Sequence, residues 1–264
     1  MREELFPPMV EALHKLGGIP IKPILAESMQ MGDENHTRQT ACDYIYDRLM
    51  LPALFELDRP KKEIMKTVRY IVDTPRFFHC YGQAAARAAL VAADGTEYST
   101  MVTAVCGNGV EFGIKIASLP GQWFTAPAPM MKGRYTSSEF TEKDQLPWMG
   151  DSCVVECYGM GGFAAAASPI VCNLRGMTLK ESIGQTKEMY RITMEKNYNF
   201  PIPNLDFDFL PVGIDIRKVL KEGVCPAIHG GMFNRVGGLI GAGMARVPMQ
   251  CFEKALVAFG EKYL

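Results

Sequence analysis

The amino-acid sequence predicts an α+β fold, because helical and β-type patterns occupy different parts of the chain. Apolar side chains recur at helical spacing through almost all of residues 1–95. From Ser99 onward, short β-branched runs alternate with glycine and proline turns. Such segregation is typical of α+β proteins, whereas alternating βαβ units would predict a parallel sheet. We therefore expect a mainly helical region, 1–95, packed as a layer on an α+β domain, 96–264, that is β-rich and carries most of the glycine-rich motif loops.

Helical patterns follow one another through the first region. We expect helices over residues 3–16, 24–31 and 37–57, and further helices that begin at Pro60 and at Thr74. Pro7 and Pro8 are expected to interrupt the first of them. The inward face of the 37–57 helix is expected to carry Ala41, Ile45, Leu49 and Phe55.

The second region opens with a hairpin signal. Asn108-Gly109 separates the apolar runs 99–106 and 110–116, and residues 122–126 suit a third strand. The remaining elements that we expect are a strand over 153–157, an alanine-rich helix after Gly162, a helix opened by the capping box Thr178-x-x-Glu181, irregular backbone over 201–211, a short helix over 214–222 and a last helix from Pro248.

The composition argues against several classes of protein. The chain has 264 residues, of which 48% are hydrophobic, and a net charge of -1. A nucleic-acid-binding protein needs a basic face, and the sequence has no basic run. The most apolar stretch, Phe163–Val171, is broken by Pro169 and is too short to span a bilayer. We expect neither export nor membrane anchoring, and therefore a cytoplasmic protein.

The cysteine pattern is that of a reduced protein without a zinc site. Eight cysteines occur, mostly in apolar surroundings. Cys153 and Cys157 form the one close pair, and no CxxC motif is present. We expect these thiols to behave as small buried hydrophobes, and we expect no metal site and no cofactor.

A charged turn, Asp33, Glu34, His36 and Arg38, separates two helical patterns. Carboxylates and an imidazole this close together can orient a substrate or transfer protons if burial shifts their pKa values. The same residues also suit an exposed turn in which Asp33 or Asn35 caps the second helix. The sequence does not decide between these two interpretations.

Two glycine-rich stretches follow in the second region. Gly159-Met160-Gly161-Gly162, preceded by Asp151, Ser152 and Glu156, can present backbone N–H groups to an anion or can simply allow close packing. His229-Gly230-Gly231, followed by Asn234 and Arg235, allows close approach of a ligand, although a single histidine after a strand is more often structural.

Three further sets of polar residues are candidates for a site. Turn chemistry explains Asn108 of the Asn-Gly pair, but not Glu111 on the strand that follows. Thr125 lies in an aromatic and proline-rich stretch that suits either a pocket mouth or a packed corner. Asp215 and Arg217 either pair locally or hold a carboxylate or phosphate.

The sequence lacks the motifs of covalent catalysis. It has no G-x-S-x-G elbow, and no cysteine stands in a protease or hydrolase context. The candidates therefore predict positioning and polarisation by fixed polar groups rather than a covalent nucleophile.

Several of these stretches, taken in order, resemble one family. They are Met31-Gly32-Asp33-Glu34-Asn35-His36-Thr37-Arg38, Asn108-Gly109-x-Glu111-Phe112-Gly113-Ile114, Trp123-Phe124-Thr125-Ala126-Pro127-Ala128, Gly150-Asp151-Ser152, Gly161-Gly162-Phe163-Ala164, Gly213-Ile214-Asp215-Ile216-Arg217 and Gly241-Ala242-Gly243. The ordered set resembles the YlbE-like (AllG-like) family and extends from about Pro20 to the end. We expect a shortened form of the family that lacks a nucleotide-binding-like N-terminal part.

The resemblance implies a function and partners. It implies a subunit of an oxamate carbamoyltransferase in allantoin breakdown, which converts oxalurate and phosphate to oxamate and carbamoyl phosphate. It also implies an FdrA-like subunit and a further small subunit, and hence an oligomer. The alternatives are a non-catalytic scaffold or ligand-sensing subunit, for which the 17 methionines would give an adaptable surface, and an amidohydrolase that opens a cyclic ureide.

We expect distant motif loops to meet around one cleft that holds an anion. The expected catalytic residues are Asp33, Glu34, His36, Glu111 and His229. The expected substrate- and phosphate-binding residues are Arg38, Asn108, Thr125, Asp151, Gly161, Gly162, Asp215, Arg217, Gly230, Gly231 and Arg235.

Overall fold

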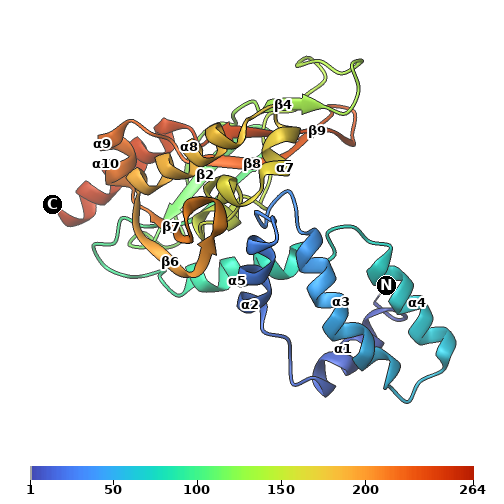
Figure 1. Cartoon of the computed structure of the whole chain (residues 1–264). Helices are drawn as coiled ribbons and strands as arrows, with labels where there is room; N and C mark the ends of the chain where they lie inside the picture. Colours follow the sequence, from blue (N-terminus) through green and yellow to red (C-terminus); the bar gives the residue numbers. More distant parts are fainter. Residues whose placement is uncertain (1) are drawn as a thin grey trace.

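The computed structural model describes residues 2–264, and helices fill the first part of the chain (Figure 1). These helices are α1 (Phe6–Lys15), α2 (Ile21–Gln30), α3 (Thr40–Phe55), α4 (Lys61–Val72) and α5 (His79–Val91). They match the helical patterns of the sequence in number and order. Figure 1 shows α2 and α5 beside the sheets, and α1, α3 and α4 farther from the sheets.

Two details of these helices differ from the predictions. Pro7 and Pro8 do not interrupt α1, because they lie in its first turn, where the backbone N–H has no partner within the helix. Leu49 and Phe55 of α3 are 40% and 57% exposed, whereas Ala41 and Ile45 are buried as expected. Pro52 lies inside this helix, so helical spacing read across it predicted the wrong face for Phe55.

The second part of the chain is mixed, and a mixed α+β fold is confirmed. Its strands are β1 (Val102–Asn108), β2 (Glu111–Ile116), β3 (Phe124–Pro127), β4 (Lys132–Tyr135), β5 (Met149–Gly150), β6 (Thr193–Ile202), β7 (Asp208–Ile214), β8 (Ala227–Phe233) and β9 (Leu239–Arg246). Its helices are α6 (Val154–Cys157), η1 (Gly161–Ala167), α7 (Pro169–Leu174), α8 (Leu179–Met189), η2 (Tyr190–Ile192), η3 (Pro203–Leu205), α9 (Ile216–Glu222) and α10 (Met249–Tyr263).

The strands form three antiparallel sheets. Their strand orders are β3-β2-β1-β5, β4-β9-β8 and β6-β7. The hairpin between β1 and β2 is confirmed: Gly109 has a positive φ of 85°, and the Asn108 side chain accepts from the N–H groups of Val110 and Glu111. The capping box of α8 is also confirmed, because Thr178 and Glu181 bond to each other's backbone N–H groups.

Two segments of the second part were predicted wrongly, and the helix expected after Gly162 is confirmed. Residues 154–157 form the single turn α6 rather than a strand, whereas the alanine-rich helix is the 3₁₀ helix η1 over residues 161–167. Much of 201–211 lies in the ribbon β6-β7 rather than in irregular backbone. Each strand of a two-stranded ribbon has a free edge, so prolines such as Pro201 and Pro211 are tolerated there.

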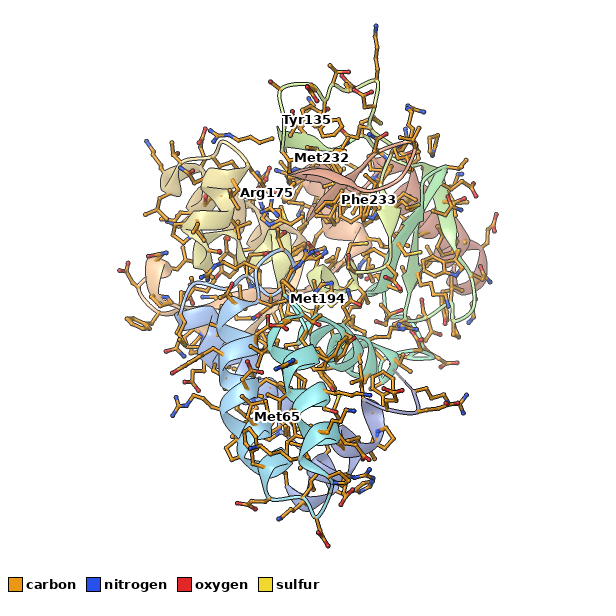
Figure 2. The ribbon with its side chains drawn as sticks, turned by 90° about the vertical axis from the view of Figure 1, so that its right-hand side faces the viewer. Met65, Tyr135, Arg175, Met194, Met232 and Phe233 are labelled. Atoms are coloured by element: carbon orange, nitrogen blue, oxygen red, sulfur yellow. The ribbon has the colours of Figure 1, made fainter. Side chains whose placement is uncertain are left out.

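One hydrophobic core connects the two parts of the chain. Buried apolar residues from Met9 in α1 to Ala255 in α10 belong to a single cluster. In Figure 2 the helical part, with Met65, lies at the bottom, and the mixed part, with Arg175 and Phe233, lies at the top. A domain boundary near residue 95 stays a prediction. Within residues 2–264, no helix is long and apolar enough to cross a membrane.

Candidate functional site

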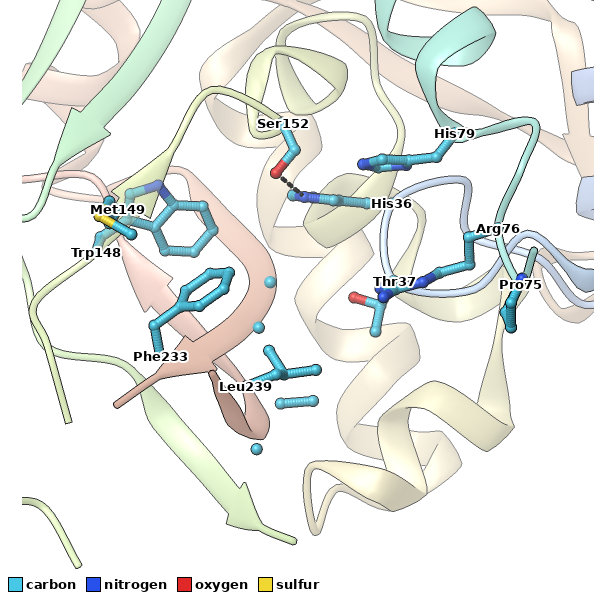
Figure 3. Close-up of a pocket in the computed structure, with 14 residues that line it drawn as sticks. His36, Thr37, Pro75, Arg76, His79, Trp148, Met149, Ser152, Phe233 and Leu239 are labelled. Carbon is cyan, nitrogen blue, oxygen red and sulfur yellow. Dashed lines mark hydrogen bonds between the residues drawn. The ribbon is translucent and has the colours of Figure 1, made fainter. Parts of the chain in front are cut away.

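A cavity of about 380 Å³ lies where the α2–α3 loop meets the β8–β9 hairpin. One of its walls is polar and carries His36, Thr37, Arg76, His79 and Ser152 (Figure 3). The facing wall is largely apolar, and its side chains are Trp148, Met149, Phe233 and Leu239. A small cavity with convergent polar groups on an apolar frame is the usual form of a ligand site.

His36 links the cavity to a buried carboxylate. Its Nε2 lies 2.8 Å from the Ser152 hydroxyl, and its Nδ1 lies 2.8 Å from Glu156 Oε1. The same Oε1 accepts from the backbone N–H groups of Gly162 and His229, at 3.1 and 2.9 Å. Backbone N–H groups can only donate, so Oε1 is an acceptor and Nδ1 of His36 carries a proton. In the neutral imidazole, Nε2 therefore presents its lone pair to Ser152.

Local structure places Ser152 and Glu156 together. They are four residues apart around the single turn α6, and this spacing puts two side chains on the same side of a helical turn. His36 comes from the α2–α3 loop, 116 residues from Ser152 in the sequence. The three residues therefore meet only when the helical part packs on the mixed part.

Gly161 and Gly162 make room for Glu156 and for the neighbouring strand. A Cβ at Gly161 would lie 2.2 Å from Glu156 Oε1, and a Cβ at Gly162 would lie 2.2 Å from the carbonyl oxygen of Ala227. Gly161 also has a positive φ of 58°. These glycines allow close packing, which was the simpler of the two interpretations of the motif, and the Gly162 N–H binds a protein carboxylate.

A second buried layer lies beneath His36. Arg175 donates to the carbonyl oxygen of Gly243, to Nδ1 of His229 and to the Thr37 hydroxyl. Glu34 Oε2 lies 3.5 Å from Nδ1 of His229, and Glu34 Oε1 accepts from the N–H groups of Thr37 and Arg38. The side chains of Glu34 and His229 are 0% exposed. Burial of so many ionisable groups is costly unless they are paired, so the cluster holds this part of the fold in one arrangement.

The surroundings shift the pKa values of these groups in different directions. Burial alone lowers the pKa of His36, but the Glu156 and Glu34 carboxylates outweigh burial and raise it above the ordinary value of 6.5. Burial, together with the nearby Arg175 guanidinium, lowers the pKa of His229 to about 3. Burial raises the pKa of Glu34, but the surrounding polar groups, among them the Arg175 guanidinium, outweigh burial and lower the pKa of Glu34 to about 2. At neutral pH the layer therefore holds an ionised Glu34 and a neutral His229.

Asp33 has a structural position in the same turn. Its carboxylate accepts from the N–H groups of Ala41 and Cys42 at the start of α3 and from the Arg38 guanidinium, at 2.8 to 3.0 Å. Both of its oxygens are thus engaged, and Asp33 is 0% exposed. Asn35, with a positive φ of 62°, bonds to Ser28, Cys42 and the carbonyl oxygen of Leu25. The turn is buried and not exposed, and Asp33 and Asn35 hold its shape.

Other residues shape the walls of the cavity. The rings of His79 and His36 stack with centroids 6.0 Å apart, and burial lowers the pKa of His79 to about 4. Gly230 lies against Trp148, since a Cβ there would be 2.6 Å from the indole ring. Gly230 and Gly231 line the cavity with backbone alone. These glycines were expected to allow close approach of a ligand, and a cavity does lie beside them.

The structure does not bring Asn108, Glu111, Thr125 or Asp151 to this cavity. Asn108 and Glu111 are exposed at the β1–β2 turn, and the Thr125 hydroxyl donates to Glu111 at 3.0 Å across strands β2 and β3. Asp151 is exposed and lines a different cavity of about 460 Å³, together with Arg87 and Trp123. The polar contacts of Asn108 are those of a turn, and the contact between Thr125 and Glu111 is that of a strand pair.

Asp215, Arg217 and Arg235 also lie elsewhere. Asp215 caps α9 through the N–H of Arg217 and accepts from the Thr100 hydroxyl at 2.8 Å. The Arg217 side chain, 60% exposed, folds back onto Asp215. Arg235 donates to the carbonyl oxygen of Lys143 in an exposed turn. These contacts correct the expectation that all the motif loops share one cleft.

Several residues of the site were not among the sequence candidates. Ser152 and Glu156 were noted beside the glycine motif but were not chosen, although their i, i+4 spacing was visible. His79 and Arg175 gave no signal, since one lies at the start of an ordinary helix and the other follows α7. Within residues 2–264, no group of three or more histidine, cysteine, aspartate or glutamate residues is placed to hold a metal ion.

Comparisons with known proteins agree with this architecture. The family model "Oxamate carbamoyltransferase subunit AllG" matches residues 1–152. The chain is 36% identical to "Uncharacterized protein YahG" and 35% identical to "Oxamate carbamoyltransferase subunit AllG", both from Escherichia coli strain K12. The alignments cover 100% and 99% of the chain but only 56% and 63% of those two proteins.

A solved structure shares the fold. It is the "crystal structure of a conserved protein of unknown function from Enterococcus faecalis V583", with a TM-score of 0.95 and 36% sequence identity. The match covers 99% of this chain and 63% of that chain. The resemblance found in the motifs is thereby confirmed, and the chain belongs to the AllG family.

Proposed function

We propose that the chain is a subunit of a carbamoyltransferase-like complex that acts on a small ureido carboxylate. The reaction would convert oxalurate and phosphate to oxamate and carbamoyl phosphate in purine and allantoin breakdown. Family membership supports the reaction class, because one relative is named as a subunit of oxamate carbamoyltransferase.

The observation that carries the proposal is the cavity beside His36. Its volume of about 380 Å³ suits a small molecule, and its polar wall combines a hydroxyl pair, Thr37 and Ser152, with two imidazoles. An oxalurate molecule offers a ureido group, an acyl carbonyl and a carboxylate to such a wall. Carbamoyl transfer needs these groups held close to the acceptor and the carbonyl polarised.

Arg76 is the residue we expect to bind the carboxylate or the phosphate. It lines the cavity, and its side chain is exposed. Its backbone has a positive φ of 60°, and the Asp43 carboxylate fixes this turn by accepting from the N–H groups of Arg76 and Phe78 at 2.8 Å. A guanidinium held at the rim can bind a carboxylate or phosphate through two parallel hydrogen bonds.

The proposal includes partners and a location. The relative is named as a subunit, so we propose an FdrA-like subunit and a further small subunit as partners, in an oligomeric complex. We also propose a cytoplasmic location, with support from the cysteines, all eight of which are free thiols.

Reconstitution tests the proposal. The chain is purified and mixed with each proposed partner and with both, and carbamoyl phosphate is measured after addition of oxalurate and phosphate. We expect product with the complete set. His36→Gln should lower kcat at least ~100-fold, the usual size of a general acid–base contribution, and Arg76→Ala should raise KM.

Arg217→Ala is the matched control, because it removes a guanidinium outside the cavity and should leave both constants unchanged. Absence of product with every combination would reject the reaction. A complex that turns over normally with His36→Gln would instead indicate the alternative function, a scaffold or ligand-sensing subunit whose partners carry the chemistry.

A further inference from the structure

The order Ser152, His36, Glu156 runs from the cavity wall into the interior. Ser152 is partly exposed and lines the cavity, His36 is 3% exposed, and Glu156 is 1% exposed. The distances from His36 to Ser152 Oγ and to Glu156 Oε1 are both 2.8 Å. Because backbone N–H groups make Glu156 Oε1 an acceptor, Nδ1 of His36 carries the proton and the lone pair of Nε2 points at the Ser152 hydroxyl. A hydroxyl, a base and a carboxylate that orients the base form the arrangement that activates a serine nucleophile.

We propose that Ser152 is a covalent nucleophile, with His36 as its base and Glu156 as the residue that positions the base, and that the carbamoyl group passes through an ester on Ser152 Oγ. The identity of the transferred group rests on the proposed function. The activated serine itself rests only on the geometry. This inference revises the expectation from sequence motifs that no covalent nucleophile is present.

Burial argues that the arrangement is more than a surface hydrogen bond. An imidazole and a carboxylate removed from water lose favourable hydration. A hydrogen bond from one serine hydroxyl does not require a buried imidazole backed by a buried carboxylate. Three donors converge on Glu156 Oε1, and Gly161 carries no side chain where a Cβ would displace that oxygen. The fold thus fixes the carboxylate, the carboxylate fixes the ring, and Ser152 Oγ is the partner of the ring at the cavity wall.

The first half-reaction balances in atoms and charge. Ser152 Oγ attacks the carbamoyl carbon of oxalurate while its proton passes to His36 Nε2. The bond from that carbon to the nitrogen that oxamate retains then breaks, and this nitrogen takes the proton from His36. The products are carbamoyl-Ser152 and oxamate.

The second half-reaction regenerates the serine. The protonated oxygen of hydrogen phosphate attacks the carbamoyl carbon, its proton passes to His36, and the bond to Ser152 Oγ breaks. Ser152 recovers its proton from His36, and carbamoyl phosphate leaves. Water in place of phosphate would give carbamate, so the apolar wall formed by Trp148 and Phe233 would also limit wasteful hydrolysis.

An aryl carbamate probe tests the nucleophile directly. The full chain is incubated with p-nitrophenyl carbamate, and release of p-nitrophenolate and the intact protein mass are followed. We expect a burst of one phenolate per chain and a mass gain of one carbamoyl group, found on the peptide that contains Ser152. Ser152→Ala should abolish the burst, and Ser152→Cys should retain carbamoyl transfer to the side chain at position 152.

Two variants make the test specific. Ser138→Ala removes an exposed serine from a loop and should label like the parent protein. Glu156→Gln should slow the burst by ~100-fold or more, because the carboxylate no longer orients the base. No label on the parent protein, a label at another residue, or an unchanged burst with Ser152→Ala would each overturn the proposal.

The pH dependence of the burst distinguishes a base from a mere structural contact. Protonated His36 cannot accept the Ser152 proton, so the burst rate should rise with pH through a pKa above 6.5. The charged or titratable groups that face the ring are Glu156, Glu34, Arg175 and His79. A burst rate that is flat from about pH 5 to 9 would contradict a base with this pKa.

Isotope exchange separates this proposal from the proposed function. Without phosphate, the complete complex should exchange ¹⁵N-oxamate into oxalurate, because a carbamoyl ester can react back with oxamate. Carbamoyl phosphate formation without exchange, or with Ser152→Ala at full rate, would overturn the ester and leave the proposed function intact. A carbamoylated Ser152 in a complex that never converts oxalurate would support the nucleophile and reject the proposed substrate.

Discussion

Two charged clusters in this molecule contain the same kinds of residue and differ in construction. Around His36, ionised and neutral groups from the α2–α3 loop, α6, the segment after α7 and β8 meet in the interior. Around Asp215, one carboxylate caps α9 and pairs with Arg217, two residues away. Arg175 in the first cluster is 8% exposed, whereas the Arg217 side chain in the second is 60% exposed.

The difference teaches how to separate a site from a cap. A carboxylate and a guanidinium close together in sequence satisfy each other, so their chemistry is complete within one turn. Groups brought together from distant segments are held by the whole core, and one of them, Ser152, faces a cavity. Convergence and burial, rather than residue type, mark the candidate site.

The largest expected contrast is between the two arginines. Arg175→Met should lower the free energy of unfolding by about 3–5 kcal/mol, because it leaves Glu34 buried beside His229 without its cation. Arg217→Met should lower it by less than about 1 kcal/mol, as for an exposed ion pair. Urea unfolding followed by circular dichroism measures both. Equal losses for the two variants would break the comparison.

A smaller contrast is expected between two glycines in the left-handed conformation. Gly161→Ala should cost about 2–4 kcal/mol, since the new Cβ is both strained and 2.2 Å from Glu156 Oε1. Gly223→Ala, at the end of α9, meets nothing within 4 Å and should cost roughly 1–2 kcal/mol of conformational strain alone. Thermal unfolding of both variants separates the crowding from the strain, and the burst assay should fail for Gly161→Ala alone.

The smallest expected effect is a change in how stability depends on pH. His79 and His229 have folded pKa values of about 4 and about 3, so unfolding takes up protons on them below pH 6.5 and stability falls as the pH falls. Glu34 has a folded pKa of about 2, so it adds a further loss of stability as the pH falls below 4.5. Burial raises the pKa of Asp33 to about 6, so Asp33 has the opposite effect: its contribution to stability increases as the pH falls from 6 to 3.8. His36 loses its stabilising contribution only as the pH rises above 6.5.

Removal of one of these histidines should reduce by one the number of protons that the chain takes up when it unfolds at low pH. His79→Gln should reduce the slope of unfolding free energy against pH by up to about 1.4 kcal/mol per pH unit between about pH 6 and 4.5. Arg217→Ala should keep the slope of the parent protein. Unfolding at a series of pH values gives both slopes, and an unchanged slope for His79→Gln would mean that this ring is not held neutral.

Sequence patterns predicted the parts of the fold that depend on neighbours in the chain. The Asn108-Gly109 hairpin, the Thr178–Glu181 capping box and the order of the first helices all follow from contacts within a few residues. The ribbon β6-β7 was missed, because its prolines are compatible with a strand only when one edge is free. Residues 154–157 were taken for a strand, because one apolar turn has no distinguishing period.

The sequence by itself determined the fold class, the family resemblance and several members of the candidate site, among them His36, Glu34 and His229. Only the tertiary structure decided that Ser152, Glu156 and Arg175 join them and that Asn108, Glu111 and Arg217 do not. The physical reason is that a helix or turn is specified by contacts between near neighbours. The meeting of His36 with Glu156, 120 residues away, depends instead on how the whole core packs.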